Sequence, residues 1–328
     1  MRKLTADTNA IAQYLKENGW LSANETVLYI EKPGEGNMNF TLRVATTKRS
    51  FIVKQSREYV EKYPQLAAPK DRVVKETEFY ALVETIPELA AMMPGLIGLD
   101  AANSIMLMDD LGKGNDYTYL YRIGALMPEN ELLALMEFAA KLHLGIRSNT
   151  TSKIIYNREM RALNHEHIFR YPFLQDNGLD LEMVLPGLKA AAQPFKNDVL
   201  LAQRASELGE LYLADGPSLL HGDYFPGSWL RTAHGVKVID PEFCFFGPPE
   251  FEIGVTIAHL KMADQPETLI SKGLAHYTAL APLEDTLRQK FTAIELLRRM
   301  LGLAQLPLEM DLEKRLALLD EARTVLTQ

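Results

Sequence analysis

The 328-residue sequence predicts an α+β protein of two lobes, a small N-terminal lobe built on an antiparallel sheet and a larger, mainly helical C-terminal lobe. Three observations support this prediction. Short β-like runs separated by tight turns fill much of the first 55 residues, and helical periodicity dominates after about Asn115. With 47% apolar residues, the chain is also long enough for two packed units. We place the lobes at residues 1–110 and 111–328.

The N-terminal lobe is predicted to begin with a helix at residues 8–18, which carries Ile11 and Leu15 on one face and stops at Gly19. Three β-like runs with turns between them follow, at residues 26–31, 39–46 and 50–55. This order is typical of an antiparallel meander. A helix and a short apolar strand complete the lobe, at residues 69–86 and 104–108.

The C-terminal lobe shows helical spacing along most of its length. Residues 129–144 and 202–214 are the strongest amphipathic segments, and the chain is helical again from Ile253 to its end. One interruption is expected, at residues 228–239, where two β-like runs flank a turn at Ala233.

Composition limits the classes of function. The formal net charge of −8, with no long run of Lys or Arg, argues against a nucleic-acid or anionic-membrane surface. Cys244 is the single cysteine, so an intrachain disulfide is excluded and a reducing compartment is favoured. Neither a signal-peptide pattern nor a membrane-spanning run is present. We therefore expect a soluble, cytoplasmic protein that acts on a small molecule; a homodimer is compatible with the sequence.

Acidic residues flank the predicted hairpin, in His221-Gly-Asp223 before it and Asp240-Pro-Glu242 after it. Phosphoryl transfer needs a carboxylate that orients a hydroxyl group and accepts its proton, and cations that neutralise a triphosphate. Asp223 suits the catalytic base, and Asp240 and Glu242 suit ligation of Mg²⁺. Ser228 lies five residues after Asp223, where eukaryotic kinases have a metal-binding Asn, and is a weaker candidate ligand. The pattern predicts a kinase that uses ATP and Mg²⁺.

The N-terminal lobe has candidate residues for the phosphates of ATP. Gly34, Gly36 and Asn37 lie in the turn between the first two strands, where glycines let backbone N–H groups approach a phosphate. Lys54 ends an apolar strand, as does the phosphate-binding lysine of kinases. Taken alone, the turn is equally typical of an ordinary hairpin, and a lysine at a strand end is usually solvated.

A glutamate of the helix at residues 69–86 is expected to orient Lys54. Glu76 and Glu78 both fall among its apolar positions, so periodicity does not choose between them.

Asp109 and Asp110 follow the last strand of the lobe. Adjacent side chains on an extended segment point apart, so we interpret this segment as a hinge and not as a pair of metal ligands. Main-chain groups of the hinge are expected to hydrogen-bond the adenine, at Met108, Asp109 and Leu111.

Together these segments resemble the aminoglycoside phosphotransferase and choline kinase superfamily, whose fold is protein-kinase-like. Within it, the chain is similar to the 5-methylthioribose kinase family. The core of the resemblance is HGDYFPGSWL followed by VIDPEFCFFGPPEFEIG. Further matches reach from the N-terminal lobe to about residue 304, in GEGNMNF, FIVKQ, DRVVKE, MDDLG and LRRMLGLA.

The resemblance implies roles for single residues. It makes Asp223 the base, Asp240 and Glu242 the magnesium ligands and Lys54 a phosphate contact. Its Asp-Arg-x-x-x-Glu pattern favours Glu76 as the partner of Lys54.

The family's paired arginines, which help to hold the sugar or its phosphate, correspond to Arg298 and Arg299. The alternative is a helix with two surface arginines. Tyr224 and Phe225 replace more polar residues, and they would make the acceptor pocket more apolar. We expect Tyr224 to contact the substrate.

The acceptor is therefore expected to be methylthioribose or a related sugar, which would place the chain in methionine salvage. A kinase for an aminoglycoside, choline, homoserine or another sugar is the alternative within the same chemistry. An alternative of another class is a catalytically silent nucleotide-binding module, against which the intact Lys54, Asp223 and Asp240 argue.

Overall fold

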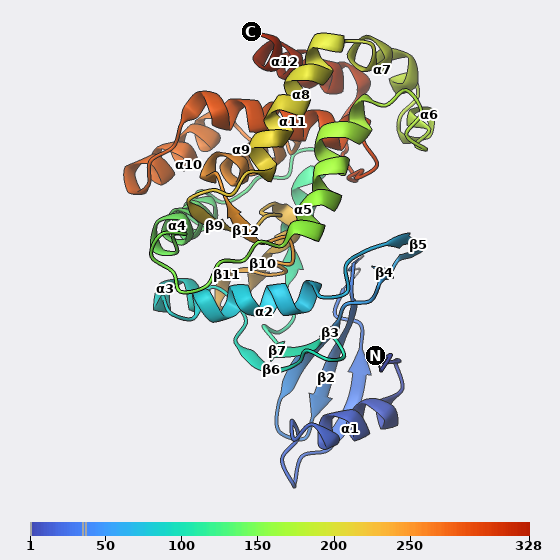
Figure 1. The fold of residues 1–328 in the computed structure, drawn as a ribbon, viewed down its shortest axis with the longest axis vertical. Coiled ribbons are helices and arrows are strands. Elements are labelled where there is room, and N and C mark those ends of the chain that lie inside the picture. Colours follow the sequence, from blue (N-terminus) through green and yellow to red (C-terminus); the bar gives the residue numbers. More distant parts are fainter. Residues whose placement is uncertain (1, 35, 37) are drawn as a thin grey trace.

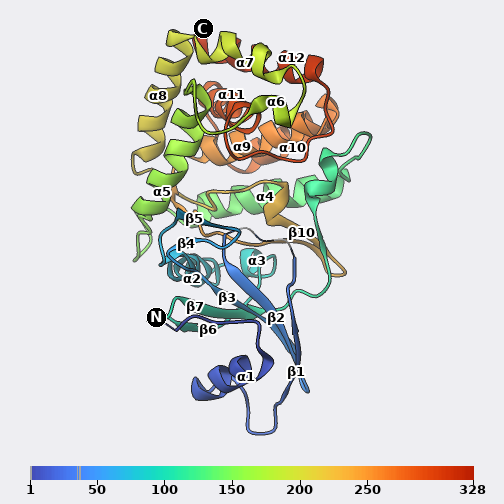
Figure 2. The same cartoon turned by 90° about the vertical axis from the view of Figure 1, so that its right-hand side faces the viewer.

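The structure, a computed structural model, describes residues 2–34, 36 and 38–328. It confirms the two-lobed α+β prediction: an antiparallel sheet lies toward the N-terminal end of an elongated molecule, and helices make up most of the rest (Figures 1 and 2). Asn37, which we expected to contact the phosphates, lies outside the described residues.

The N-terminal lobe is a five-stranded antiparallel sheet in the order β1-β2-β3-β7-β6. Its inward-facing side chains, among them Leu42, Val44 and Val53, pack with Ile11 and Leu15 of the first helix into one buried cluster. The elements are α1 (Thr8–Glu17), β1 (Val27–Glu31), β2 (Phe40–Thr46), β3 (Ser50–Gln55), β6 (Leu96–Asp100) and β7 (Ile105–Asp109).

Two helices and a short ribbon connect β3 to β6. The helix expected at 69–86 is present as α2 (Arg72–Val83), and a turn separates it from a short further helix, α3 (Pro87–Ala90), which begins at Pro87. The ribbon of β4 (Tyr59–Val60) and β5 (Tyr63–Ala67) was not predicted. It is short, and β5 is exposed on all its residues, so it has no alternating apolar pattern.

The C-terminal lobe is built around a core of α9, α11 and α12, beside which α4 packs on α10. The amphipathic segments predicted at 129–144 and 202–214 correspond to α4 and α8. The helices are α4 (Glu129–Gly145), α5 (Arg158–His165), α6 (Leu181–Val184), α7 (Leu188–Lys196), α8 (Val199–Leu213), α9 (Pro249–Met262), α10 (Glu267–Leu280), α11 (Asp285–Leu301) and α12 (Leu312–Thr327).

Short strands in this lobe position the acidic motifs. The predicted hairpin is present as β10 (Trp229–Thr232) and β11 (Gly235–Val238), with β8 (Asn115–Asp116) beside it. The expectation of a single interruption is wrong, because β9 (Ser218–Leu220) pairs with β12 (Phe245–Gly247). Both strands have three residues and are fully buried, so they lack the alternation that reveals a strand. Their pairing holds the chain before Asp223 against the chain after Glu242.

Hydrogen bonds join the two lobes near the hairpin. The Val238 amide donates to the Met92 carbonyl at 2.8 Å, and Lys237 Nζ donates to the Ala91 carbonyl at 2.6 Å. The sheet ends at Asp109, and the expected boundary between residues 110 and 111 stays a prediction. Within the part of the chain that the structure describes, every helix is too short or too polar to cross a membrane.

Candidate active site

His221 ties the two acidic motifs together. Its Nε2 donates to the Ile239 carbonyl at 2.9 Å, so the backbone just before Asp240 lies against the His221 ring. The Nδ1 atom then accepts from the Asp223 amide at 3.4 Å. The imidazole fixes both carboxylate-bearing loops relative to each other.

The turn that carries Asp223 depends on Gly222 and Glu252. Gly222 has a φ of +85°, and a Cβ atom there would lie 2.2 Å from the Phe243 carbonyl oxygen, so only glycine fits. The buried Glu252 carboxylate of α9 accepts from the amides of His221 and Gly222, at 3.2 and 2.8 Å. It also bonds His143 at 3.0 Å, which fits a structural role for that histidine.

Lys54 pairs with two carboxylates on the nucleotide side of the site. It is 3% exposed, and its Nζ donates to Glu76 Oε2 at 2.6 Å and to Asp240 Oδ1 at 2.7 Å. Burial by itself lowers the pKa of this ammonium, but the Asp240 and Glu76 carboxylates raise it well above its usual value. The geometry therefore selects Glu76 as the partner, while Glu78 pairs with Lys75 on the helix surface at 3.3 Å.

The three candidate metal ligands lie in different surroundings. The Asp240 side chain is 52% exposed, and its backbone has the rare left-handed φ of +63°, a strain that often marks functional sites. Glu242 is 5% exposed, and its Oε2 accepts from Asn39 at 2.9 Å and Arg72 at 3.2 Å. Ser228 Oγ donates to the Asp223 carbonyl at 2.7 Å.

The donor set fits a Mg²⁺ ion that is shared with a phosphate ligand. Among the described residues there is no cluster of three His, Cys, Asp or Glu side chains able to hold a metal. Mg²⁺ commonly takes one or two protein carboxylates, with phosphate oxygens and waters completing its shell. Asp240 supplies a half-exposed carboxylate of this kind, whereas Glu242 is neutralised by Arg72 in the arrangement observed.

Asp223 faces the arginines of α11. Burial raises the pKa of its carboxyl to about 6, while Arg299 and then Arg298 act to lower it. Arg299 Nη2 lies 3.8 Å from Asp223 Oδ1, and the guanidinium stacks 4.9 Å from the centre of the Phe225 ring.

Arg298 is also buried, with 7% exposed. Its Nη1 donates to Glu295 Oε2 and its Nη2 to Asn164 Oδ1, each at 3.1 Å. The Nε atom is buried and has no hydrogen-bond partner among the described residues. The alternative of two surface arginines is therefore wrong.

The structure corrects the prediction that Tyr224 contacts the substrate. Its side chain is 1% exposed, its hydroxyl donates to the Leu135 carbonyl at 2.9 Å, and its ring stacks on Phe138. The ring thus lies in the core of the C-terminal lobe, away from the arginines. Its neighbour Phe225 points the other way and contacts Arg299.

The expected hinge keeps its two carboxylates apart. Asp110 accepts from Arg43 Nε at 2.8 Å, whereas Asp109 is exposed and its amide donates to the Gly95 carbonyl at 2.8 Å. Met108 is buried in β7, whereas Leu111 lies in the loop that follows and is partly exposed. This arrangement favours a hinge over a metal pair.

The glycine turn is open to solvent where it is described. Gly34 and Gly36 are exposed, and a Cβ atom at either would meet nothing within 4 Å. Close approach of a ligand to this backbone is sterically free.

Sequence reasoning missed several residues that support the site. Asn39 and Arg72 hold Glu242, and Asn157 donates to the carbonyls of Glu242 and Cys244 at 2.9 and 3.0 Å. These partners are 85 to 203 residues apart, so no local spacing reveals them. Glu295 is different, because it precedes Arg298 and Arg299 by three and four residues, a visible helical pattern.

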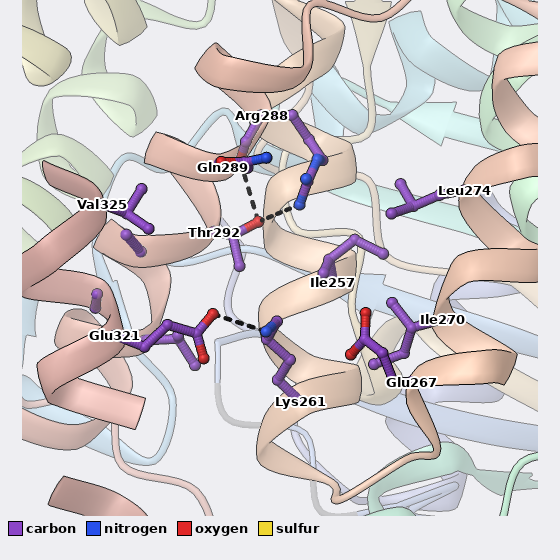
Figure 3. A pocket seen from close by; sticks show the side chains of 13 residues that line it. Ile257, Lys261, Glu267, Ile270, Leu274, Arg288, Gln289, Thr292, Glu321 and Val325 are labelled. Carbon is purple, nitrogen blue, oxygen red and sulfur yellow. Dashed lines mark hydrogen bonds and ion pairs between the residues drawn. The ribbon is translucent and has the colours of Figure 1, made fainter. Parts of the chain in front are cut away.

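A separate cavity of about 310 Å³ lies among α9, α10, α11 and α12 (Figure 3). Three of its charged side chains have partners: Lys261 pairs with Glu321 at 2.7 Å, and Arg288 pairs with Asp285 at 2.7 Å. None of the acidic or basic residues of the candidate site lines it.

The chain is similar to curated methylthioribose kinases. The chain is 27% identical over 330 residues to a methylthioribose kinase of Bacillus velezensis, covering 87% of this chain and 81% of that protein. It is 28% identical over 258 residues to a methylthioribose kinase of Exiguobacterium sibiricum, covering 75% of this chain and just under two thirds, 64%, of that protein.

Among solved structures, the choline kinase LicA from Streptococcus pneumoniae has the same fold, with a TM-score of 0.54, 14% identity and coverage of 97% of this chain and 98% of that one. The sequence pattern of the phosphotransferase enzyme family matches residues 30–289. These residues include the glycine turn, Lys54 and both acidic motifs. The chain therefore belongs to the phosphotransferase enzyme family.

Proposed function

We propose that the chain is a small-molecule kinase that transfers the γ-phosphoryl group of MgATP to a hydroxyl group of a sugar, methylthioribose or a closely related one. One observation carries the proposal. Asp240, which pairs with Lys54, and Asp223, which faces Arg299, lie in loops that His221 cross-links, so a phosphate-binding side and an acceptor side meet at one point.

Each side of the reaction has its residues. The acceptor oxygen attacks the γ-phosphorus as the bond to the β–γ bridging oxygen breaks, and its proton passes to Asp223. A carboxyl with a pKa of about 6 is ionised at pH 7 and still basic enough for this task. Lys54, oriented by Glu76, contacts the phosphates. Mg²⁺ held at Asp240 would neutralise charge on the triphosphate.

The remaining nucleotide contacts extend the proposal to the N-terminal lobe. The main chain of Met108, Asp109 and Leu111 bonds the adenine, and the turn at Gly34 and Gly36 covers the phosphates. Ser228 and Glu242 stay candidate metal ligands; Arg72 and Asn39 both donate to the Oε2 atom of Glu242.

The charges beside Asp223 favour a sugar over a cationic acceptor. Glu295 is the acidic neighbour, and both arginines already donate to it. An ammonium group would therefore meet two guanidinium groups, whereas sugar hydroxyls can accept hydrogen bonds from them. The methylthioribose kinases among the relatives support the same choice and a place in methionine salvage.

ADP release with MgATP tests the proposal, with methylthioribose beside ribose, choline, homoserine and an aminoglycoside. Asp223→Asn is the inactive variant, and Asp320→Asn, on an exposed pair with Arg323, is the matched control. Turnover confined to sugars, lost in Asp223→Asn only, is expected. Turnover with choline, homoserine or the aminoglycoside alone would overturn the acceptor assignment. ATP binding without turnover of any acceptor would favour a silent nucleotide-binding module.

A further inference from the structure

Glu295 is a fully buried carboxylate on α11, and three side chains converge on it. Arg299 Nε donates to Oε1 at 2.6 Å, Arg298 Nη1 donates to Oε2 at 3.1 Å, and His259 Nε2 lies 3.0 Å from Oε1. Helical geometry explains part of this, since residues three and four positions apart share a face. The carboxylate therefore lies directly behind the two arginines that face the acceptor side.

His259 adds a neutral donor to this cluster. Its Nδ1 lies 2.6 Å from the Tyr121 hydroxyl, and its Nε2 faces Glu295. Burial lowers the pKa of His259 to about 4, so the ring is neutral at pH 7. A neutral ring with Nε2–H donating to Glu295 accepts from Tyr121 at Nδ1. The negative charge of Glu295 is therefore balanced by the two arginines and not by His259. The hydrogen bond from His259 holds the carboxylate in place.

Arg299 lies close to Asp223 but does not form a hydrogen bond with it. Its Nη2 is 3.8 Å from Asp223 Oδ1, beyond ordinary hydrogen-bond length, while its Nε is bonded to Glu295 and its face rests on Phe225. Guanidinium and carboxylate groups otherwise form close bidentate pairs. The short bond to Glu295 opposes such a pair here, together with a longer bond from Arg299 Nη1 to the Ala304 carbonyl at 3.4 Å.

We propose that Glu295 is a positioning residue for the acceptor: it holds Arg298 and Arg299 toward the acceptor side and keeps Arg299 from closing onto Asp223. The inference rests on the proposed kinase function. Closure of Arg299 onto Asp223 would occupy the oxygen that must take the acceptor's proton. It would also remove a donor from the acceptor hydroxyls.

Glu295→Gln tests the role, because it keeps the shape of the side chain and removes its charge. We expect kcat/KM for the acceptor to fall at least tenfold while KM for ATP stays within about twofold. Glu321→Gln is the matched control, since it breaks a 2.7 Å ion pair on the far side of α9. If Glu295 acts through the two arginines, the double variant Glu295→Gln/Arg299→Gln loses less activity than the sum of the two single losses. Additive losses would overturn the proposal.

Two further measurements keep the proposal open to refutation. Glu295→Asp retains the charge but withdraws the carboxylate, so it should fold, bind ATP and show a raised acceptor KM; an unchanged acceptor KM would count against positioning. A crystal structure of either variant needs no acceptor, and it should show Arg299 within hydrogen-bond distance of Asp223. An unmoved Arg299 would refute the positioning role even if the proposed sugar proved to be wrong. If Arg299 closes onto Asp223 in the variants but the wild type phosphorylates another acceptor, only the sugar assignment is refuted.

Discussion

Replacing Lys54 with Met should destabilise the protein by an amount that depends on pH. The substitution keeps the apolar stem and removes the charge that pairs with the fully buried Glu76. Burial raises the pKa of Glu76 to about 8 even beside Lys54, and without Lys54 no cation opposes burial, so the folded variant keeps its proton to a still higher pH. Asp240 loses the same partner at little cost, because its side chain is 52% exposed.

The size of the effect follows from the cost of that proton. A carboxyl with an ordinary pKa of 4.5 costs about 1.36 kcal/mol to protonate for each pH unit above that value. Below pH 8 both folded proteins carry this proton, so the loss in free energy of unfolding is nearly independent of pH there; above pH 8 only the variant does, and the loss grows by up to about 1.36 kcal/mol for each further pH unit. The sign is fixed: a raised folded pKa gives stability that is complete below 4.5 and is lost as pH rises.

Denaturant unfolding of the wild type and the variant at pH 7, 8 and 9 measures this difference. Lys272→Met is the control, because its exposed pair with Glu129 should change stability by less than about 0.5 kcal/mol at any of these pH values. A loss that is the same at pH 7 and pH 9 would refute the reasoning, since Glu76 would then stay protonated beside Lys54 at pH 9 as well.

Three other outcomes are expected. Asp223→Asn should lower kcat about 10²- to 10⁴-fold while calorimetry shows an unchanged Kd for MgATP; near-normal turnover would remove Asp223 from the role of base. The wild-type kcat should rise with pH through about 6, as the Asp223 carboxyl loses its proton; a pH–rate profile that is flat from pH 5 to 7 would contradict this. Tyr224→Phe breaks the bond to Leu135, so it should lower the free energy of unfolding by about 1–3 kcal/mol and leave the acceptor KM unchanged. A raised acceptor KM would instead indicate that Tyr224 contacts the acceptor.

Local patterns predicted most of the fold. The meander of β1, β2 and β3, the helices α1, α4 and α8 and the β10–β11 hairpin each carry their own periodicity or turn signal. The β9–β12 pair has neither, since three buried residues show no alternation. Its existence depends on the packed core of the C-terminal lobe, which the sequence alone does not specify.

The candidate site was predictable where motifs are compact. His221-Gly-Asp223 and Asp240-Pro-Glu242 flank a hairpin, so their proximity follows from the turn. Two features required the three-dimensional structure. Tyr224 and Phe225 point to opposite sides, and only packing against Phe138 decides which one enters the core. Glu242 meets Arg72, 170 residues away, so its neutralisation has no local signal.

Phosphorus NMR of the reaction products tests the central claim most directly. The protein is incubated with MgATP and methylthioribose, and its Asp223→Asn variant is treated in parallel. We expect ADP to appear together with a new phosphomonoester whose phosphorus couples to a sugar proton, and neither to appear with the variant. ADP accompanied only by inorganic phosphate, or a sugar phosphate formed equally well by the variant, would contradict transfer to a sugar hydroxyl with Asp223 as the base.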